Sequence, residues 1–392
     1  MQKNNYKKDE NSGNGFSVNQ TSYDFTLAKN QSFEKRENEV RSLSYFGRAT
    51  YTLKNKYILN GVFRESGASQ LAKGNKWGFF PGISAAWIVS NEDFLKNVSA
   101  INELKLRIGW GKTGNLSGLP AYSSFDLNYT NPLTNATTLD QIGNSDLKWE
   151  TTITQNLGLD YELFKGRVSG SVEVYKNVTK DLLTNFPIPG TGYDYQYRNM
   201  GETQNTGIEA SLNVVAINKQ NYGLNFSFNI GANKNRINSL GVMDNFGINT
   251  GWASTAIGND FVVNVGQPIG MMYGYKSDGR YEVSDFDYSG GVYTLKSGIA
   301  NNSTIVGTVM PGTMKLKDID GDGIVNSKDL TIIGNANPKH TGGLVINANA
   351  YGFDLSAAFN WSYGNDIYNA NKIEFNTSSQ NSQYRNLSTI MA

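Results

Sequence analysis

Hydrophobic and polar residues alternate along two neighbouring segments in the middle of the chain, within residues 205–230. A period of two is what a β-strand imposes on its side chains, because successive residues point to opposite faces. A short polar stretch between the segments, residues 218–221, is typical of a hairpin turn. The pattern predicts an antiparallel hairpin whose apolar face carries Ile208, Ala210, Leu212, Val214, Leu224, Phe226, Phe228 and Ile230.

The same alternation recurs and predicts four further hairpins, over residues 43–64, 77–110, 149–176 and 344–361. Together they make about ten strands of roughly ten residues each, the length that a tilted strand needs to cross a membrane. The fold class is therefore all-β. We expect residues 1–41 to form a polar loop with one partial strand at residues 23–27.

The connections alternate between short and long. Those inside hairpins cover residues 54–56, 90–102, 163–166, 218–221 and 351–352. Those between hairpins cover residues 67–76, 113–148, 181–204 and 238–340. An outer-membrane β-barrel places short turns on one rim and long loops on the other. A β-sandwich is the alternative, but charged residues on one face of most strands fit a wet barrel interior better.

A barrel also predicts which side chains meet lipid. A charge facing the middle of the membrane costs about 2–4 kcal/mol, so the apolar face of each strand should point outwards. In the central hairpin we expect Leu212, Val214, Leu224, Phe226 and Phe228 to face lipid. We expect the lumen to receive Glu209, Ser211, Asn213 and Asn225.

Composition further limits the classes of fold and function that the chain can have. Aromatic residues reach 12% of the 392 residues, and 42 Gly stand against 8 Pro, which suits strands and tight turns. The net charge of +1 gives no indication of a nucleic-acid partner, and the absence of Cys excludes disulfides and thiolate metal sites. The polar first fifteen residues lack a signal-peptide core. Taken alone, the missing signal-peptide core indicates a cytoplasmic protein. A piece of a longer precursor would lack it too, and we expect the chain to be such a piece.

One loop carries a metal-binding pattern, in the sequence DIDGDGIVNSKD of residues 318–329. Carboxylates occupy positions 1, 3 and 5, Gly323 permits the bend at position 6, and a carboxylate closes position 12, as in calcium-binding loops. The alternative is an exposed series of Asp-Gly turns without an ion. We predict Ca²⁺ held by Asp318, Asp320, Asp322, the carbonyl of Ile324, Asn326 and Asp329.

Nothing else in the sequence predicts a chemical site. His340 is the only histidine, and we expect it to be a solvated loop residue. Residues 109–114, GWGKTG, lack the spacing and the following helix of a phosphate-binding loop. No Ser/His/Asp arrangement is present, so we predict that the protein is not an enzyme.

Several stretches resemble the SusC/RagA-type TonB-linked outer-membrane transporters, in family order from about residue 42 to residue 369. They include SYFGRATYTLKNKYILNGVFRESGAS, NKWGFFPGISAAW, LKLRIGWGKTGN, LKWETTITQNLGLDYELFKGRVSGSVEVYKNVTKDLL and DIDGDGIVNSKDLTIIGNANPKHTGG. The resemblance implies a twenty-two-stranded barrel, plugged by an N-terminal domain and energised through TonB. It also implies import of glycans or peptides with a SusD-like surface lipoprotein. No plug domain or TonB box is found, so we expect residues 42–392 to be barrel, with residues 237–340 as a large extracellular loop.

Two functions follow from these patterns. The first is nutrient import across the outer membrane, as the resemblance implies. The second is a surface adhesin or glycan-binding protein without transport. Aromatic residues in the long loops would provide stacking surfaces for sugars in that case: Trp252, Tyr273, Tyr275, Tyr281 and Tyr288.

Overall fold

The computed structural model describes residues 2–16, 28–130, 137–188, 190–193, 195–252 and 258–375. Its regular structure is almost entirely β, as predicted, and no helix in the described ranges is long and apolar enough to cross a membrane. The chain divides into two compact units, residues 1–160 with 176–202 and residues 161–175 with 203–392. Each unit is described by itself below.

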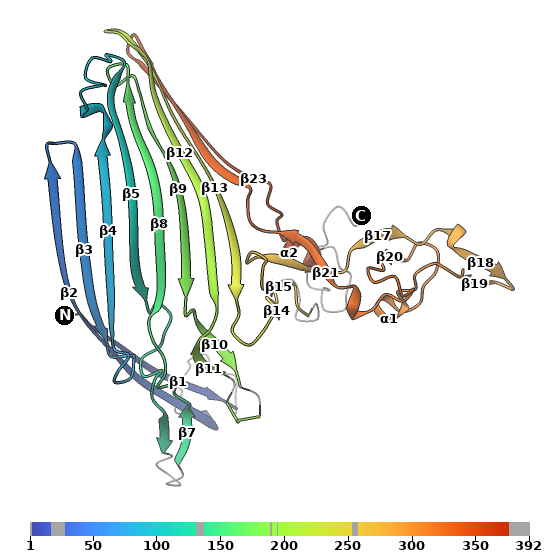
Figure 1. Ribbon diagram of the computed structural model, residues 1–392. Helices are drawn as coiled ribbons and strands as arrows, with labels where there is room; N and C mark the ends of the chain where they lie inside the picture. Colours follow the sequence, from blue (N-terminus) through green and yellow to red (C-terminus); the bar gives the residue numbers. More distant parts are fainter. Residues whose placement is uncertain are drawn as a thin grey trace. The chain divides into compact units, whose positions relative to one another are not determined.

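Eleven strands form the main sheet, in the order β1-β2-β3-β4-β5-β8-β9-β12-β13-β22-β23 (Figure 1). Their bounds are β1 Gln2–Asn14, β2 Asn30–Leu53, β3 Tyr57–Ala68, β4 Trp77–Ile88, β5 Ile101–Asn115, β8 Glu150–Leu163, β9 Val168–Lys180, β12 Glu202–Asn218, β13 Tyr222–Ser239, β22 His340–Ala350 and β23 Phe353–Tyr363. Ten of the eleven are the strands that the alternation predicted.

The connections contain shorter elements. Those of the first unit are η2 Val89–Asn91, β6 Leu127–Thr130, β7 Thr137–Gln141, β10 Leu183–Pro187 and β11 Tyr195–Asn199. Those of the second unit are β14 Asn245–Ile248, β15 Phe261–Asn264, β16 Met271–Gly274, β17 Ser277–Arg280, η4 Val283–Asp285, β18 Phe286–Ser289, β19 Val292–Leu295, α1 Ser303–Val306, β20 Met314–Leu316, η5 Ser327–Asp329, β21 Thr331–Asn335 and α2 Ala370–Phe375.

The expectation of a loop over residues 1–41 is wrong for most of that segment. β1 pairs with the first half of β2 in an antiparallel ladder from Gln2 opposite Ser42 to Asn14 opposite Asn30. Cross-strand ion pairs support the ladder, such as Lys3 with Glu39 at 2.8 Å. Both faces of this hairpin are polar, so it lacks the apolar alternation on which the strand predictions rested. The strand piece expected at residues 23–27 lies outside the described residues.

In the first unit, short and long connections lie at opposite ends of the strands, as predicted. At one end, the Ile88 N–H donates to the Lys56 carbonyl at 2.7 Å, which joins the turn at residues 54–56 to η2. At the other end, the three long connections share a small hydrophobic core of Leu71, Leu119 and Leu147, packed against Leu116, Trp149, Leu183 and Tyr197.

The second unit shows the same separation. The Val215 N–H donates to the Arg167 carbonyl at 2.7 Å, and the Tyr351 N–H donates to the Asn221 carbonyl at 2.9 Å. These bonds bring the three short turns of the unit together at one end. Antiparallel pairing of β13 with β22 then places residues 240–339 at the opposite end.

The described parts of this segment, residues 240–252 and 258–339, are folded rather than irregular. They contain a four-stranded sheet, β14-β15-β16-β21, and two two-stranded sheets, β17-β20 and β18-β19, the second of which is a hairpin. A separate core holds Tyr281, whose hydroxyl donates to Asn302 Oδ1 at 2.8 Å with both residues buried. The predicted loop has its own packing, and it holds the acidic motif.

Candidate functional site

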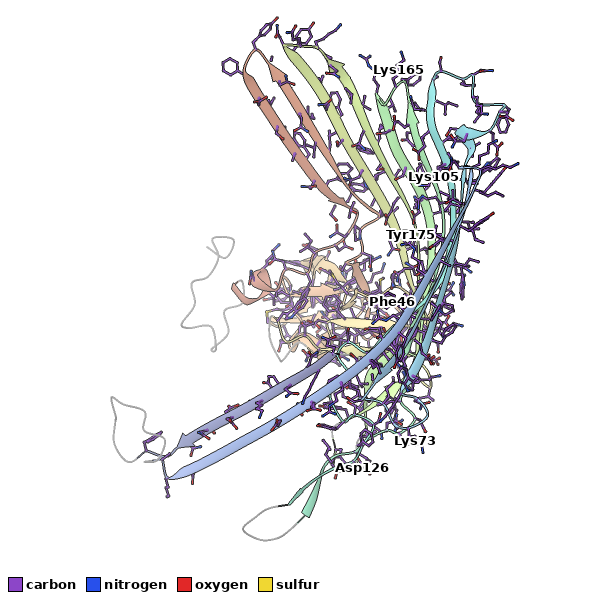
Figure 2. The ribbon with its side chains drawn as sticks, turned by 90° about the vertical axis from the view of Figure 1, so that its left-hand side faces the viewer. Phe46, Lys73, Lys105, Asp126, Lys165 and Tyr175 are labelled. Atoms are coloured by element: carbon purple, nitrogen blue, oxygen red, sulfur yellow. The ribbon has the colours of Figure 1, made fainter. Side chains whose placement is uncertain are left out.

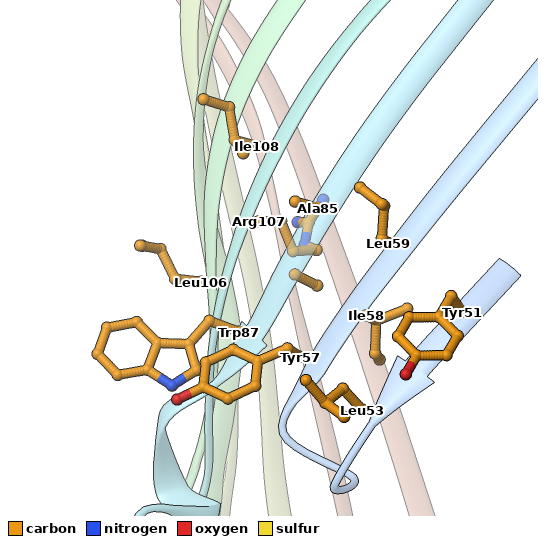
Figure 3. A pocket seen from close by; sticks show the side chains of 11 residues that line it. Tyr51, Leu53, Tyr57, Ile58, Leu59, Ala85, Trp87, Leu106, Arg107 and Ile108 are labelled. Atoms are coloured by element: carbon orange, nitrogen blue, oxygen red, sulfur yellow. The ribbon is translucent and has the colours of Figure 1, made fainter.

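The first unit carries large apolar side chains on the exposed face of its sheet. The register of β2 to β5 aligns them in two rows: Leu53, Tyr57, Trp87 and Leu106, then Tyr51, Leu59, Ala85 and Ile108. They line an open groove of about 280 Å³ near the short turns (Figure 3). A water-soluble protein buries such rows, so this face is built for an apolar surrounding.

The apolar rows end where charge begins. On β3 this face carries Tyr57, Leu59 and Phe63, and the next position on the same face is Glu65. From Tyr57 to Phe63 the strand rises about 20 Å at 3.4 Å per residue. The apolar band of outer-membrane barrels is about 25 Å tall, with aromatic residues at its borders. The stacked rings of Tyr57 and Trp87, 6.5 Å apart, fit the border on the short-turn side.

The second unit separates its two faces in the same way. Phe226 aligns with Ile346 and Ala357, and Phe228 aligns with Leu344 and Phe359, so one face is apolar across three strands. The opposite face aligns Asn225 with Asn347 and Ser356, and the Ser356 hydroxyl bonds to Asn347 Oδ1 at 2.8 Å. The placement that the sequence predicted for Phe226 and Phe228 on one face and Asn225 on the other is confirmed on β13.

The inner, polar face of the first unit carries arginines. Arg107 donates to both carboxylate oxygens of Asp160, at 2.8 and 2.9 Å, and Lys105 lies 3.3 Å from the same group. Arg48 donates to Asn60 Oδ1 at 2.8 Å, and Arg64 contacts two serine hydroxyls. Lys105 and Phe46, also on this face, are labelled in Figure 2. Sequence reasoning did not single out these arginines, because their neighbours depend on the register.

A hydrogen-bonded cluster around one carboxylate stabilises the short-turn end of the first unit. Glu92, just after η2, accepts from Lys56 Nζ at 2.8 Å, from the Tyr57 hydroxyl at 2.6 Å and from Trp87 Nε1 at 3.0 Å. The bond from Lys56, followed by those from Tyr57 and Trp87, lowers the pKa of Glu92 to about 2. These four residues bind the turn at residues 54–56 to the connection after β4.

The acidic loop brings three of its predicted ligands together. Asp318, Asp320 and Asp322 each have a carboxylate oxygen within 4.8 Å of the others, and this is the one such acidic group found in the described ranges. Two backbone N–H groups, of Gly321 and Gly323, donate to Asp318 at 2.7 and 2.8 Å. The oxygen-only donor set fits a hard cation such as Ca²⁺.

The other three predicted ligands lie in the hydrogen bonds of the loop itself. Asp329 is buried and accepts from the N–H groups of Ile319 at 2.7 Å and Asn326 at 2.8 Å. These backbone bonds, that of Asn326 foremost, hold the pKa of Asp329 below its usual range. The Asn326 amide donates to the Ile324 carbonyl at 3.0 Å. Asp329 thus holds the acidic loop in its conformation through hydrogen bonds from the loop backbone.

Two other predicted features take unexpected positions. His340 is the first residue of β22 and is half-buried; its ring stacks on Tyr363 at 5.0 Å and its Nδ1 accepts from Trp361 Nε1 at 3.1 Å. The expectation of a solvated loop residue is therefore wrong. Tyr281, proposed as a sugar-stacking ring, is only 1% exposed, whereas Trp252 is 61% exposed and packs against Phe261.

Comparison with known proteins places this arrangement in a family. Residues 2–389 match the family model described as TonB dependent receptor-like, beta-barrel. The chain belongs to this family. It is 32% identical over 351 residues to TonB-dependent receptor P3 of Formosa agariphila, covering 88% of this chain and 34% of that protein. It is 35% identical over 235 residues to TonB-dependent receptor SusC of Bacteroides thetaiotaomicron, covering 57% of this chain and 23% of that protein.

Solved structures agree on the fold. The RagAB peptide importer in its closed-closed state matches with a TM-score of 0.69 and 21% identity, over 87% of this chain and 35% of that one. The chain spans about a third of the length of the relatives it matches. Members of the TonB-dependent receptor family are outer-membrane β-barrel proteins and not enzymes. The exposed apolar face of this chain is what a barrel of this family requires where it meets lipid.

Proposed function

We propose that the chain forms part of a SusC-type importer, which takes up glycan oligosaccharides or peptides with energy supplied through TonB. The observation that carries the proposal is the division of the sheet into an apolar outer face and a polar inner face, in a family of TonB-dependent receptors. The resemblance to SusC and to a peptide importer supports these cargo classes. A SusD-like surface lipoprotein is the proposed partner.

Uptake by living cells tests this proposal. A strain lacking the full-length gene is grown beside its parent on defined pools of oligosaccharides and of peptides, and depletion of each component is followed by mass spectrometry. We expect the deletion to abolish depletion of a subset, and a strain lacking TonB to lose the same subset. A tagged full-length protein should co-purify with a surface lipoprotein. Identical depletion by parent and deletion strain would reject import.

We also propose that the acidic loop binds one Ca²⁺. Asp318, Asp320 and Asp322 would supply carboxylate oxygens, with the carbonyl of Ile324, Asn326 and Asp329 completing the set. Neutralising three converging carboxylates would order residues 318–329, a role in shaping the loop rather than in contacting cargo. The Ile324 carbonyl keeps a second lone pair for the ion while accepting from Asn326.

Titration calorimetry of the purified full-length protein measures this binding. We expect one Ca²⁺ per chain, with Mg²⁺ competing poorly because it demands a rigid octahedral shell. The Asp320→Ala, Asp322→Ala double variant should lose the binding heat. Asp287→Asn, which removes a charge from β18 outside the motif, should keep it. Equal binding by the double variant and the wild type would show that the ion is held elsewhere.

A further inference from the structure

Arg64 lies on the inner face of the first unit, and hydrogen bonds hold its side chain in place. Its Nε donates to Ser66 Oγ at 2.9 Å, and its Nη2 lies 3.2 Å from Ser44 Oγ. The two hydroxyls are themselves 2.9 Å apart, on neighbouring strands. The serines hold one edge of the guanidinium, while the residue remains exposed towards the interior. Side-chain hydroxyls position the charge without neutralising it.

The charge of Arg64 has no counter-ion in the part of the chain that the structure describes. No Asp or Glu oxygen among those residues lies within 4.0 Å of it, nor of Arg48, its diagonal neighbour on the same face. Diagonal positions on neighbouring strands lie about 7–8 Å apart, within reach of long side chains. Arg107, on the same face, is by contrast paired with Asp160. Of these three arginines on the inner face of the first unit, Arg107 is neutralised by Asp160, and Arg64 and Arg48 can bind an anion.

A pocket of about 380 Å³ opens beside Arg64. One wall is aromatic: Phe80, directly across from Arg64 on β4, meets Trp149 edge-on with ring centroids 5.3 Å apart. The Phe80 ring packs over Gly78 and Gly114, which leave room for it because they have no side chain. A Cβ on Gly114 would be 2.1 Å from the Phe80 ring. Glycines also form the floor at Gly82 and Gly111. The pocket thus combines a cation, hydroxyls and an apolar ring surface.

We propose that this pocket binds a carboxylate of the cargo, with Arg64 as the ligand of the anion and the half-buried Trp149, supported by the buried Phe80, packing against the adjoining body of the molecule. A guanidinium presents parallel N–H groups that match a carboxylate. The inference rests on the proposed import function and narrows it to acidic cargo, either uronic-acid oligosaccharides or acidic peptides. Arg48 adds a second positive charge that attracts the same group.

Binding to the purified full-length protein tests the site without requiring transport. The probes are two matched pairs: trigalacturonate with its fully methylated ester, and a C-terminally amidated pentapeptide containing Glu with its Gln counterpart. We expect the wild type to bind the acidic member of one pair at least about tenfold more tightly, as a charge-assisted bond to a single carboxylate provides. The pair that shows the preference identifies the class of cargo.

Variants assign that preference to the pocket. Arg64→Gln should bring the acidic and neutral probes to within about twofold of each other, with binding of the neutral probe unchanged, whereas Arg64→Lys should keep part of the preference. Lys54→Gln, in the turn of the same hairpin, removes one positive charge far from the pocket and should keep all of it. In the wild type, the acidic probe should also protect Arg64 from phenylglyoxal, which does not depend on the variant folding.

Three outcomes would overturn the inference. In the first, neither acidic probe is preferred by the wild type. In the second, Arg64→Gln weakens acidic and neutral probes equally, which would give Arg64 a structural role instead of a role in binding the anion. In the third, Arg64 is not protected. Acidic probes that bind through Arg64 but do not enter cells would leave the site established and reject import instead.

Discussion

At the short-turn end of the first unit, one residue, Glu92, contributes to the stability of the fold through its hydrogen bonds. Glu92 receives three hydrogen bonds from Lys56, Tyr57 and Trp87, and its pKa falls to about 2. A carboxylate whose pKa is lower in the folded state stabilises the fold above its unfolded pKa, near 4.5. That stabilisation is lost as the pH falls from about 4.5 towards 2.

Replacing Glu92 by Gln should therefore lower the thermal unfolding midpoint of the full-length protein in detergent by a few degrees at pH 7. The gap between variant and wild type should close as the pH falls towards 2, because the wild-type carboxyl then also becomes neutral. Asp93→Asn, one residue along and paired only with the exposed Lys96, is the matched control and should shift the midpoint less. A gap that stays constant with pH would mean that the charge of Glu92 contributes nothing.

Residue-level chemistry was only partly predictable from the sequence. The spacing of the acidic motif identified Asp318, Asp320 and Asp322, which the structure brings together. It did not show that Asp329 is buried and braced by backbone N–H groups. Arg64 and Glu92 were not predicted either, since their partners Ser44 and Lys56 come from neighbouring strands or turns. Only the strand register supplies those neighbours.

At the scale of elements, alternation predicted the ten strands that have one apolar face. It failed for β1 and the first half of β2, whose two faces are both polar and whose ladder rests on backbone bonds and ion pairs such as Lys7 with Glu37. It also left residues 240–339 as a loop, although they hold a four-stranded sheet. The strands of that sheet have four or five residues, too few for a period of two to stand out.

At the scale of the whole molecule, the sheet reverses the usual arrangement of a soluble protein. In the second unit, large apolar side chains such as Leu355 and Phe359 are exposed on one face, while Asn347 and Ser356 lie on the other. In the described sheet, every strand between β1 and β23 has a neighbouring strand on both sides to bond its backbone groups, as a membrane requires. Lipid contact then depends on the face to which a residue belongs, and adjacent residues of one strand should differ sharply in what they tolerate.

Phe226 and Asn225 provide that comparison on β13. Phe226→Arg in the full-length protein places a charge on the apolar face and should cost about 2–4 kcal/mol if the site lies near the middle of the membrane. We expect less folded, heat-modifiable protein in the outer membrane. Asn225→Arg places the same charge on the polar face beside Asn347 and should leave the yield close to that of the wild type. Similar yields from the two variants would show that the Phe226 face does not meet lipid.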